Sequence, residues 1–537
     1  MPLQTNTLYY GDNLQILRDY IPDESIDLIY LDPPFNSQRS YNVLFKESTT
    51  AASAAQMEAF EDTWHWNDPA IAAYEHVALY GTDDTAKLLK AMVDALGNND
   101  VTAYLSMMAI RLIEMRRALK PTGSIYLHCD PTASHYLKVL MDSIFGPTNF
   151  VNEVVWKRTS SHNDTKRFGR IHDCILVYGR GSSRRFNVLR RELDPSYVEK
   201  FYTRVDENGR RYRLDNISAP GGRGPIYEWH GRTQPWRYTR EHMEQLFAAG
   251  RIKVYPDGRA MVNAYVRYLD ENEGQPIQDW WDDIGVIAAP AKERLGYPTQ
   301  KPLPLLDRII EASSNPGDIV LDPFCGCGTA VHAAQALGRK WIGIDVTHLA
   351  IGLIRTRMQD AFPSLEGSIA VVGEPVDLTG AAELAATHPY QFQWWALGRL
   401  SADTPQGDRK KGMDRGIDGI IAFLEGESKR RRVIVSVKAG KLTPNHVRDL
   451  KGVLEREGEP IGVLFSLNEP TREMKTEAAA AGMYRSETWN ESYPKIQLIT
   501  AADIFNGRKV AMPPRVRSSA APPVERKREG KQTGLDL

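Results

Sequence analysis

Ile26-Asp27-Leu28-Ile29-Tyr30-Leu31-Asp32-Pro33-Pro34-Phe35 is the stretch that decides the fold. Its first six residues form an apolar run, which is typical of a strand buried inside a parallel sheet. Two consecutive prolines cannot continue a hydrogen-bonded ladder, so the strand must end in a rigid turn. Ligands of open α/β sheets bind just past the carboxyl ends of the strands. The stretch therefore predicts an α/β fold with a site at Asp32, although it also suits a plain strand and turn.

The turn itself favours one kind of ligand. The Asp32 carboxylate and the backbone carbonyl of Pro33, whose direction the proline ring restricts, are two acceptors that suit a single amino group. The ring of Phe35 can stack on a planar ring that carries this amino group. The site is therefore expected to hold a small planar group with an exocyclic nitrogen.

A second motif begins at the end of another apolar run, Ile319-Val320-Leu321. It reads Asp322-Pro323-Phe324-Cys325-Gly326-Cys327-Gly328-Thr329, followed by a helical stretch that ends before Gly338. Glycines in such a turn let the backbone approach a ligand, and a helix N-terminus favours an anionic group. A further predicted strand ends at Asp345, 17 residues after Gly328, where an acid can bind ribose hydroxyls. The pattern predicts a nucleotide-type pocket.

These motifs resemble those of DNA amino-methyltransferases that use S-adenosylmethionine. Asp32 to Phe35 resembles the catalytic motif and Asp322 to Thr329 the cofactor motif, with Cys327 where serine is more usual. Tyr10-Gly11-Asp12-Asn13 resembles the turn that contacts the adenine of the cofactor. The segment from Gly296 to Pro302 resembles the part that completes the methionine end. Because the catalytic motif comes first, the order is that of the β subgroup, over about residues 7–365.

The resemblance implies a role for each matching residue. Catalysis would fall to Asp32, Pro33, Pro34 and Phe35. The cofactor would be held by Asp12, Asn13, Gln300, Lys301, Pro302, Asp322, Phe324, Gly326, Gly328, Thr329 and Asp345. The target base would be flipped out of duplex DNA before methyl transfer. Asp at the first position of the catalytic motif favours N6 of adenine, and N4 of cytosine remains the alternative.

The middle of the chain is basic. Residues 151–261 contain 22 Lys and Arg against 13 Asp and Glu, whereas the whole chain has a net charge of −1. The clusters considered for DNA phosphates are Lys157-Arg158, Lys166-Arg167 and Arg210-Arg211. The alternative is an ordinary solvated basic face. Residues 41–100 are expected to be either a loop that closes over DNA or a structural insertion.

A further domain is expected near the C-terminus. A strand with an acid at Asp418 and a second strand ending at Lys438 resemble the PD-(D/E)xK nucleases, in detail the Mrr-like restriction endonucleases. In that family the acid holds Mg²⁺ and the lysine helps to activate water. Here the middle position is Ser436, and Asp418 is the only clear carboxylate for a metal. DNA cleavage, a non-cutting role in DNA binding or docking, and an unrelated α/β domain all remain open.

Length and composition suit several soluble domains. The chain has 537 residues, with 42% hydrophobic and 25% charged residues. The expected fold is a Rossmann-like, doubly wound methyltransferase domain with an inserted target-recognition region and a C-terminal PD-(D/E)xK-like α/β domain. The boundaries are 1–150 for the catalytic part, 151–295 for target recognition, 296–365 for the cofactor part, 366–385 for a linker, 386–512 for the nuclease-like domain and 513–537 for a disordered basic tail.

No apolar run is long enough for a membrane helix and no signal peptide is evident, so a cytoplasmic protein is expected. The expected function is site-specific methylation of adenine in duplex DNA, in restriction-modification or phage defence. The expected cofactors are S-adenosylmethionine and, if the C-terminal domain binds a metal, Mg²⁺. The alternatives are a DNA-binding defence protein with the C-terminal domain as effector, and methylation of RNA or protein. A homodimer and a partner nuclease or defence protein remain open.

Overall fold

The computed structural model describes residues 3–34, 66–160, 168–288, 291, 293, 295, 299–365, 368–402, 416–425 and 429–514. Phe35, Lys166, Arg167 and the segment 296–298 lie outside these residues, as do positions 35–65 and the tail from 515 onward. The chain divides into two compact units. The first comprises Met1–Asn187 and Asp279–Leu537, and the second comprises Val188–Gln278.

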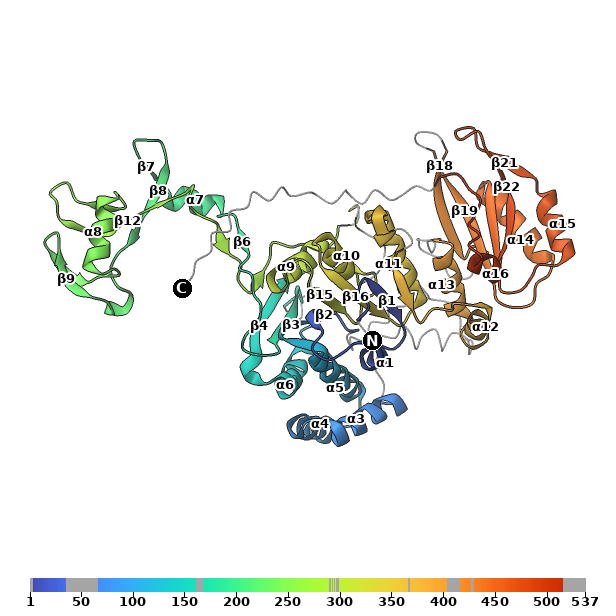
Figure 1. Ribbon diagram of the computed structural model, residues 1–537, viewed down its shortest axis with the longest axis horizontal. Coiled ribbons are helices and arrows are strands. Elements are labelled where there is room, and N and C mark those ends of the chain that lie inside the picture. The colour runs from blue at the N-terminus through green and yellow to red at the C-terminus, as the bar shows by residue number, and fades with distance from the viewer. Residues whose placement is uncertain are drawn as a thin grey trace. The chain divides into compact units, whose positions relative to one another are not determined.

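A nine-stranded sheet forms the centre of the first unit (Figure 1). In spatial order its strands are β14 (Trp280–Trp281), β4 (Phe150–Lys157), β5 (His172–Gly179), β3 (Leu119–Cys129), β2 (Ile26–Leu31), β15 (Ile319–Asp322), β16 (Lys340–Asp345), β1 (Thr7–Tyr10) and β17 (Ala370–Val372). Neighbouring strands are parallel except that β5 runs antiparallel to both β3 and β4. The expected α/β class is confirmed, with a mixed rather than wholly parallel sheet.

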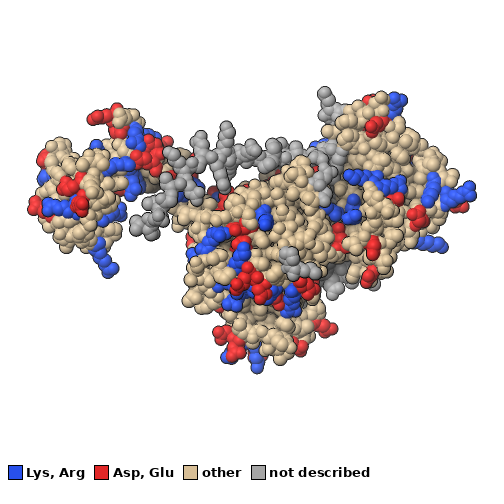
Figure 2. Space-filling view, viewed as in Figure 1, with Lys and Arg blue, Asp and Glu red and all other residues tan. Residues whose placement is uncertain are grey.

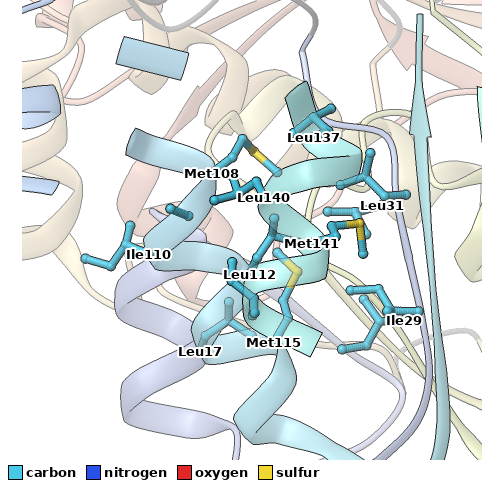
Figure 3. Packing of buried hydrophobic residues seen from close by; sticks show 14 of the residues in the cluster. Leu17, Ile29, Leu31, Met108, Ile110, Leu112, Met115, Leu137, Leu140 and Met141 are labelled. Atoms are coloured by element: carbon cyan, nitrogen blue, oxygen red, sulfur yellow. The ribbon is translucent and has the colours of Figure 1, made fainter. Parts of the chain in front are cut away.

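Helices cover both faces of this sheet, as Figure 1 shows. On one side lie α1 (Asn13–Tyr20), α5 (Asp100–Ala118) and α6 (Ser134–Phe145), and on the other lie α9 (Leu303–Ser313), α10 (Thr329–Ala336) and α11 (His348–Ala361). Figure 3 shows Met108, Leu112 and Met115 of α5 packed among side chains of α1, α6 and β2. All six residues of β2 are buried, which explains its unbroken apolar run.

The region after the catalytic motif is partly helical. Helices α3 (Asp68–Tyr80) and α4 (Asp83–Leu96) pack near α5 and α6. Ala73, Val77 and Leu89 of these helices belong to the same hydrophobic core as β2. In the described part of 41–100 the structure thus has an insertion that packs on the domain.

The second unit is a small α+β structure. A four-stranded sheet has the order β11 (Ile252–Val254), β12 (Ala260–Tyr268), β8 (Arg211–Asn216) and β7 (Arg204–Val205). Two antiparallel pairs are added: the hairpin of β9 (Ile226–Trp229) and β10 (Arg232–Pro235), and the pairing of β6 (Arg190–Arg191) with the distant β13 (Gln275–Pro276). The helices are α7 (Pro195–Phe201) and α8 (Arg240–Ala248). Trp229 and Trp236 are buried in its own core with Met243 of α8, so this segment has the anatomy of a domain.

The C-terminal part contains a second, smaller sheet with the order β18 (Gly419–Glu425), β19 (Lys429–Lys438), β20 (Ile461–Ser466) and β23 (Ile496–Thr500). Its first pair is antiparallel and the others are parallel. One face packs on α13 (Pro389–Arg399) and α16 (Ala501–Phe505), the other on α14 (Asn445–Glu457) and α15 (Arg472–Ala480). A short pair, β21 (Met483–Arg485) and β22 (Ser492–Pro494), completes it. The two strands expected around Asp418 and Lys438 are present as β18, which begins directly after Asp418, and β19, which ends at Lys438.

Two ranges differ from the expected domain layout. Residues 151–187, assigned to target recognition, contain β4 and β5 of the central sheet, and the separate unit begins at Val188. The range 366–385, expected as a linker, contains β17, which pairs with Thr7–Tyr9, and most of α12 (Leu378–Thr387). The short apolar run Ala370-Val371-Val372 in this range is long enough to form one edge strand. The composition of the range as a whole gives no indication of a sheet strand.

Candidate active site

Four adjacent parallel strands bring the sequence motifs to one edge of the central sheet. In spatial order they are β2, β15, β16 and β1, and they are followed or ended by Asp32, Asp322, Asp345 and Asp12. Because parallel strands have their carboxyl ends at the same edge, motifs about 310 residues apart in sequence become neighbours. The edge therefore carries four carboxylates, each at the end of its own strand.

Asp32 stands at the end of β2 beside a lysine. Lys301 Nζ donates a hydrogen bond to Asp32 Oδ2, and the two side chains are only 13% and 16% exposed. Pro33 and Pro34 follow as predicted and end the strand. The proposed role of Lys301 at the cofactor is untested, but its ammonium group lies at the predicted catalytic carboxylate.

A row of buried polar groups crosses the sheet from β2 to β5. The Tyr30 hydroxyl lies 3.1 Å from His128 Nδ1, and His128 Nε2 lies 3.1 Å from Asp173 Oδ2. Burial raises the pKa of Tyr30 well above its usual range, and the negative charge of Asp32 adds to this. Burial would raise the pKa of Asp173 too, but the hydrogen bond and charge of His128 hold it low. An ionised Asp173 only accepts, so His128 Nε2 carries a proton and donates to Asp173 Oδ2.

The glycine turn after β15 is tied to the neighbouring strand. The Gly326 N–H donates to Asp345 Oδ2 at 2.9 Å, and the Cys325 N–H donates to the Ile344 carbonyl at 3.0 Å. Gly328 has φ +73°, and helix α10 begins at the next residue. Asp322 Oδ1 accepts a hydrogen bond from the N–H of Phe324, two residues further along the chain, at 3.1 Å. The predicted strand, turn and helix are present in this order.

Asp345 is held in a fixed orientation at the end of β16. Its Oδ1 accepts from the N–H and the hydroxyl of Thr347, at 2.9 and 2.8 Å. Burial raises the pKa of Asp345 to about 6, although these hydrogen bonds oppose the shift. Burial also raises the pKa of Asp322 well above its usual range. Burial is the main cause of both raised pKa values, and groups with perturbed pKa values are common at functional sites.

The turn after β1 meets the turn after β15 through one side chain. Asp12 caps α1, since its Oδ1 accepts from the Leu14 N–H at 2.7 Å. Asn13 Nδ2 donates to the Pro323 carbonyl at 2.8 Å. The structure thus joins the predicted adenine-contacting turn to the cofactor motif.

In the segment before α9, Gln300 binds backbone groups of the residues just ahead of it. Gln300 Nε2 donates to the Glu293 carbonyl at 2.6 Å, and Gln300 Oε1 accepts from the Leu295 N–H at 2.8 Å. Pro302 is the N-cap of α9. Gln300 therefore shapes this segment, whereas Lys301 reaches the site.

Several site residues were not predicted from sequence. Tyr30, His128, Asp173 and Arg111 are all buried polar side chains within apolar strands or helices. The usable signal was a polar residue interrupting an otherwise apolar buried run, because such a residue must find a partner inside the fold. The partners themselves lie on other elements and could not be read from spacing.

Three of the six expected DNA-binding residues, Arg158, Arg210 and Arg211, already have partners within the protein. Arg210 pairs with Asp270 and Glu271 at 2.8 Å each, and Arg211 donates to the Tyr202 carbonyl at 3.0 Å. Arg158 directly follows Lys157, the last residue of β4, and its Nη1 lies 3.6 Å from Asp173 Oδ1. Figure 2 shows basic and acidic side chains intermingled on the visible face, without a single basic surface. Phosphate contacts by these arginines would have to compete with existing ion pairs.

The C-terminal sheet offers poor ligands for Mg²⁺. Asp418 Oδ1 accepts from Gln393 Nε2 at 2.7 Å, and its Oδ2 accepts from the Val437 N–H at 2.6 Å and from Ser436 Oγ at 3.3 Å. Among the residues that the structure describes, no group of three or more His, Cys, Asp or Glu side chains could hold a metal. Because no such group of ligands surrounds Asp418, the described residues do not fit the metal site of an active nuclease.

Fold and site together define an α/β protein whose central sheet carries four carboxylates and a glycine turn at the carboxyl ends of neighbouring parallel strands. Residues 26–354 match the model of the N6/N4 family described as DNA methylase, and the chain belongs to this family. Residues 393–505 match the model of NACHT-associated inactive Restriction Endonuclease 1.

Curated relatives cover the methylase part. A type II methyltransferase, M.EcaI of Enterobacter cloacae, is 37% identical over 262 residues, which are 48% of this chain and 57% of that protein. The StyLTI Mod subunit of a type III restriction-modification enzyme, from Salmonella typhimurium, is 28% identical over 62% of this chain and 50% of its own length. This chain thus spans about half the length of these two relatives.

Among solved structures, the cytosine-N4-specific PvuII DNA methyltransferase aligns with a TM-score of 0.32 and 13% identity, over 68% of this chain and 94% of that one.

Across the residues that the structure describes, no helix combines the length and the apolar character needed to span a membrane.

Proposed function

We propose that this protein transfers a methyl group from S-adenosylmethionine to the N6 amino group of adenine in duplex DNA. The observation that carries the proposal is the position of Asp32. Its carboxylate ends β2, directly beside β15 and the glycine turn that follows it. The proposed acceptor for an amino group and the turns proposed to bind the cofactor therefore share one edge of the sheet.

The residues at this edge fit S-adenosylmethionine. Asp345 accepts one N–H at Oδ2 and retains acceptor capacity for ribose hydroxyls. The first turn of α10 presents backbone N–H groups, which favour an anionic group such as the carboxylate of the methionine portion. When bound, the cofactor supplies an electrophilic methyl group on a sulfonium centre.

The catalytic work of the chain is to position and polarise the amino group. The lone pair of an exocyclic amine is conjugated into its ring, which makes the nitrogen a poor nucleophile. Hydrogen bonds from the amino group to Asp32 and to the Pro33 carbonyl would favour a pyramidal nitrogen with a free lone pair. Phe35 would stack on the flipped base. Positioning and electrostatics of this kind supply much of the rate enhancement of enzymes.

The second unit is proposed to contact DNA. It has a groove of about 600 Å³ lined by both charged and apolar side chains: Phe201, Arg204, Arg213, Leu214, Asp215, Asn216, Tyr255, Met261, Val262 and Asn263. Arginine and amide side chains are the usual readers of guanine and adenine edges. Arg204 and Asn263 are the candidates for base contacts, because Arg213 already pairs with Asp215 at 3.2 Å, as Arg210 and Arg211 do with their own protein partners.

We propose a non-cleaving role for the C-terminal domain, in DNA binding or in docking a partner. Asp418 and the strand that ends at Lys438 resemble the Asp–Lys arrangement of PD-(D/E)xK enzymes, while residues 393–505 match a model described as an inactive restriction endonuclease. One relative is named as a Mod subunit, hence a component of a larger enzyme. A partner nuclease in restriction-modification or phage defence, in the cytoplasm of the host, is consistent with this role.

The test is methyl transfer from labelled S-adenosylmethionine to unmethylated duplex DNA, with nucleoside mass spectrometry of the product. N6-methyladenine is the expected product. N4-methylcytosine would retain the mechanism and change the target. Label in RNA or protein during a competition among the three substrates, with none in DNA, would refute the proposal. Cofactor binding without any methyl transfer would favour the binding-protein alternative.

A further inference from the structure

Arg111 is a charged residue in the buried part of α5. Its side chain is only 4% exposed and it lies between Ile110 and Leu112, both in the hydrophobic core. Removing a guanidinium group from water costs several kcal/mol unless it is paired and hydrogen-bonded. A helix that packs by its apolar residues has no structural need of this charge, so the contacts of Arg111 must explain it.

Arg111 makes hydrogen bonds to the start of α1 and to its own helix, α5. Arg111 Nη2 donates to both carboxylate oxygens of Asp12, at 3.1 and 2.9 Å. Its Nε donates to Asn13 Oδ1 at 2.7 Å, and Nη1 donates to the Met107 carbonyl at 3.0 Å. One guanidinium thus binds two consecutive residues of the turn after β1.

The contact to Asn13 extends to the cofactor motif. A guanidinium is only a donor, so the atom of Asn13 that faces it must be the amide oxygen. The amide nitrogen then faces the Pro323 carbonyl, to which it donates at 2.8 Å. The chain Arg111–Asn13–Pro323 therefore sets the separation between the turns after β1 and β15, which lie on either side of β16.

We propose that Arg111 is a positioning residue for cofactor binding, which holds the turn after β1 against the turn after β15 through Asp12 and Asn13. The inference rests on the proposed function, because it assumes that these turns bind S-adenosylmethionine. Arg111 itself lies behind the turns and is not expected to contact the cofactor. The planar fork of arginine is required, since a lysine ammonium cannot bind the Asp12 carboxylate and the Asn13 amide in the same geometry.

Arg117 provides a matched control on the same helix. Its Nη1 donates to the Ile21 carbonyl at 3.0 Å and its Nη2 donates to the Leu17 carbonyl at 2.6 Å. It also pairs with Asp23 and Glu114. Arg117 thus ties α5 to the other end of α1, away from the cofactor turns, with a similar number of contacts.

The experiment compares wild type, Arg111→Lys and Arg117→Lys by calorimetric titration with S-adenosylmethionine and by thermal unfolding. We expect Arg111→Lys to weaken cofactor binding at least about tenfold, which corresponds to the loss of one charge-assisted hydrogen bond. KM for the cofactor should rise while kcat at saturating cofactor stays near wild type, because the chemistry at Asp32 is untouched. Arg117→Lys should change the melting temperature without changing cofactor affinity.

Asn13→Ala covers the case in which Arg111→Lys folds poorly, because it breaks the same chain without leaving a charge unpaired. It should weaken cofactor binding in the same direction. Wild-type affinity in both Arg111→Lys and Asn13→Ala, or an equal loss of affinity in Arg117→Lys, would overturn the inference. Absence of cofactor binding by the wild type would instead overturn the proposed function.

Discussion

Lys301 donates a hydrogen bond to Asp32 across a sequence separation of 269 residues. The lysine comes from the segment before α9 and the aspartate from the end of β2, and both are largely buried. An ion pair in this position neutralises one carboxylate in a region that also contains Asp322 and Asp345. Because Lys301 occupies Oδ2, we expect the amino group of the substrate to bind Oδ1.

The first prediction concerns Asp32. Asp32→Asn should lower kcat for methyl transfer at least about 100-fold, since the amide removes the charge that polarises the amino group, an effect of the size seen for single electrostatic groups. Cofactor affinity should remain within a few-fold of wild type. Single-turnover methyl transfer and equilibrium titration measure the two quantities separately. Retained methyl transfer in Asp32→Asn would remove Asp32 from the catalytic role.

The second prediction concerns its partner. Lys301→Met should leave the Asp32 carboxylate without its cation and should reduce kcat, whereas Lys301→Arg should retain part of the activity because the charge remains. A lysine that served only the cofactor would instead raise KM for S-adenosylmethionine with little change in kcat. Steady-state kinetics with each substrate varied in turn distinguishes these roles. Gln300→Ala, which alters the same segment without removing a charge, is the control.

Much of the fold could be predicted because its central strands correspond to short apolar runs in the sequence. The runs at 26–31, 319–322 and 341–345 are strands in the structure, and the predicted acid is the last residue of two of them and directly follows the first. The order and the direction of the strands in the sheet were harder to predict. Nothing in the sequence indicates that β5 is antiparallel or that Ala370–Val372 closes the edge beside β1, since pairing depends on contacts between distant segments.

The site was predicted to the extent that it lies in local motifs. Asp12, Asn13, Asp322 and Asp345 lie at one sheet edge, as their places after strands required. Tyr30, His128 and Asp173 were missed because a buried polar residue is explained only by its partner, and the partners lie on three different strands. Arg210 was expected to bind phosphate. Its ion pairs with Asp270 and Glu271 were not predicted, because these partners are distant in sequence.

The third prediction is a pH dependence of cofactor binding. Burial raises the pKa of Asp345 to about 6, so the carboxyl is ionised above this pH and protonated below it. A protonated carboxyl is a weaker acceptor for ribose hydroxyls, and affinity for S-adenosylmethionine should fall as the pH drops through about 6. Isothermal titration between pH 5 and 8 measures the midpoint, and Asp345→Asn should abolish this dependence.

The Thr347 hydroxyl gives a matched test of the same shift. Its hydrogen bond to Asp345 Oδ1 lowers the pKa of that carboxyl, so Thr347→Val should move the midpoint to higher pH. Thr347→Ser keeps the hydroxyl, which also caps α11, and should leave the midpoint in place. A midpoint that is identical in the Val and Ser variants would assign the titration to another group.

The fourth prediction separates backbone strain from steric clash in the cofactor turn. Gly328 and Gly338 both have φ +73°, where a side chain costs about 1 kcal/mol or more. A Cβ at Gly328 would lie 2.7 Å from Ile354 Cγ1, whereas at Gly338 the nearest atom is 3.9 Å away. Gly328→Ala should therefore lower the free energy of unfolding by a further ~1–3 kcal/mol beyond Gly338→Ala. Urea unfolding of both variants gives the comparison, and equal losses would exclude the clash.

The last prediction concerns the C-terminal sheet. Gln393, Val437 and Ser436 already donate to the Asp418 carboxylate, so Mg²⁺ should neither raise the melting temperature of the full chain nor produce cleavage of plasmid DNA. Asp418→Ala should destabilise the protein by ~1–3 kcal/mol, because buried donors lose their acceptor. Asp449→Ala, on the exposed face of α14, is the control and should have little effect. Mg²⁺-dependent cleavage that disappears in Lys438→Ala would show instead that the carboxylate exchanges its protein donors for a metal and that the domain is an active nuclease.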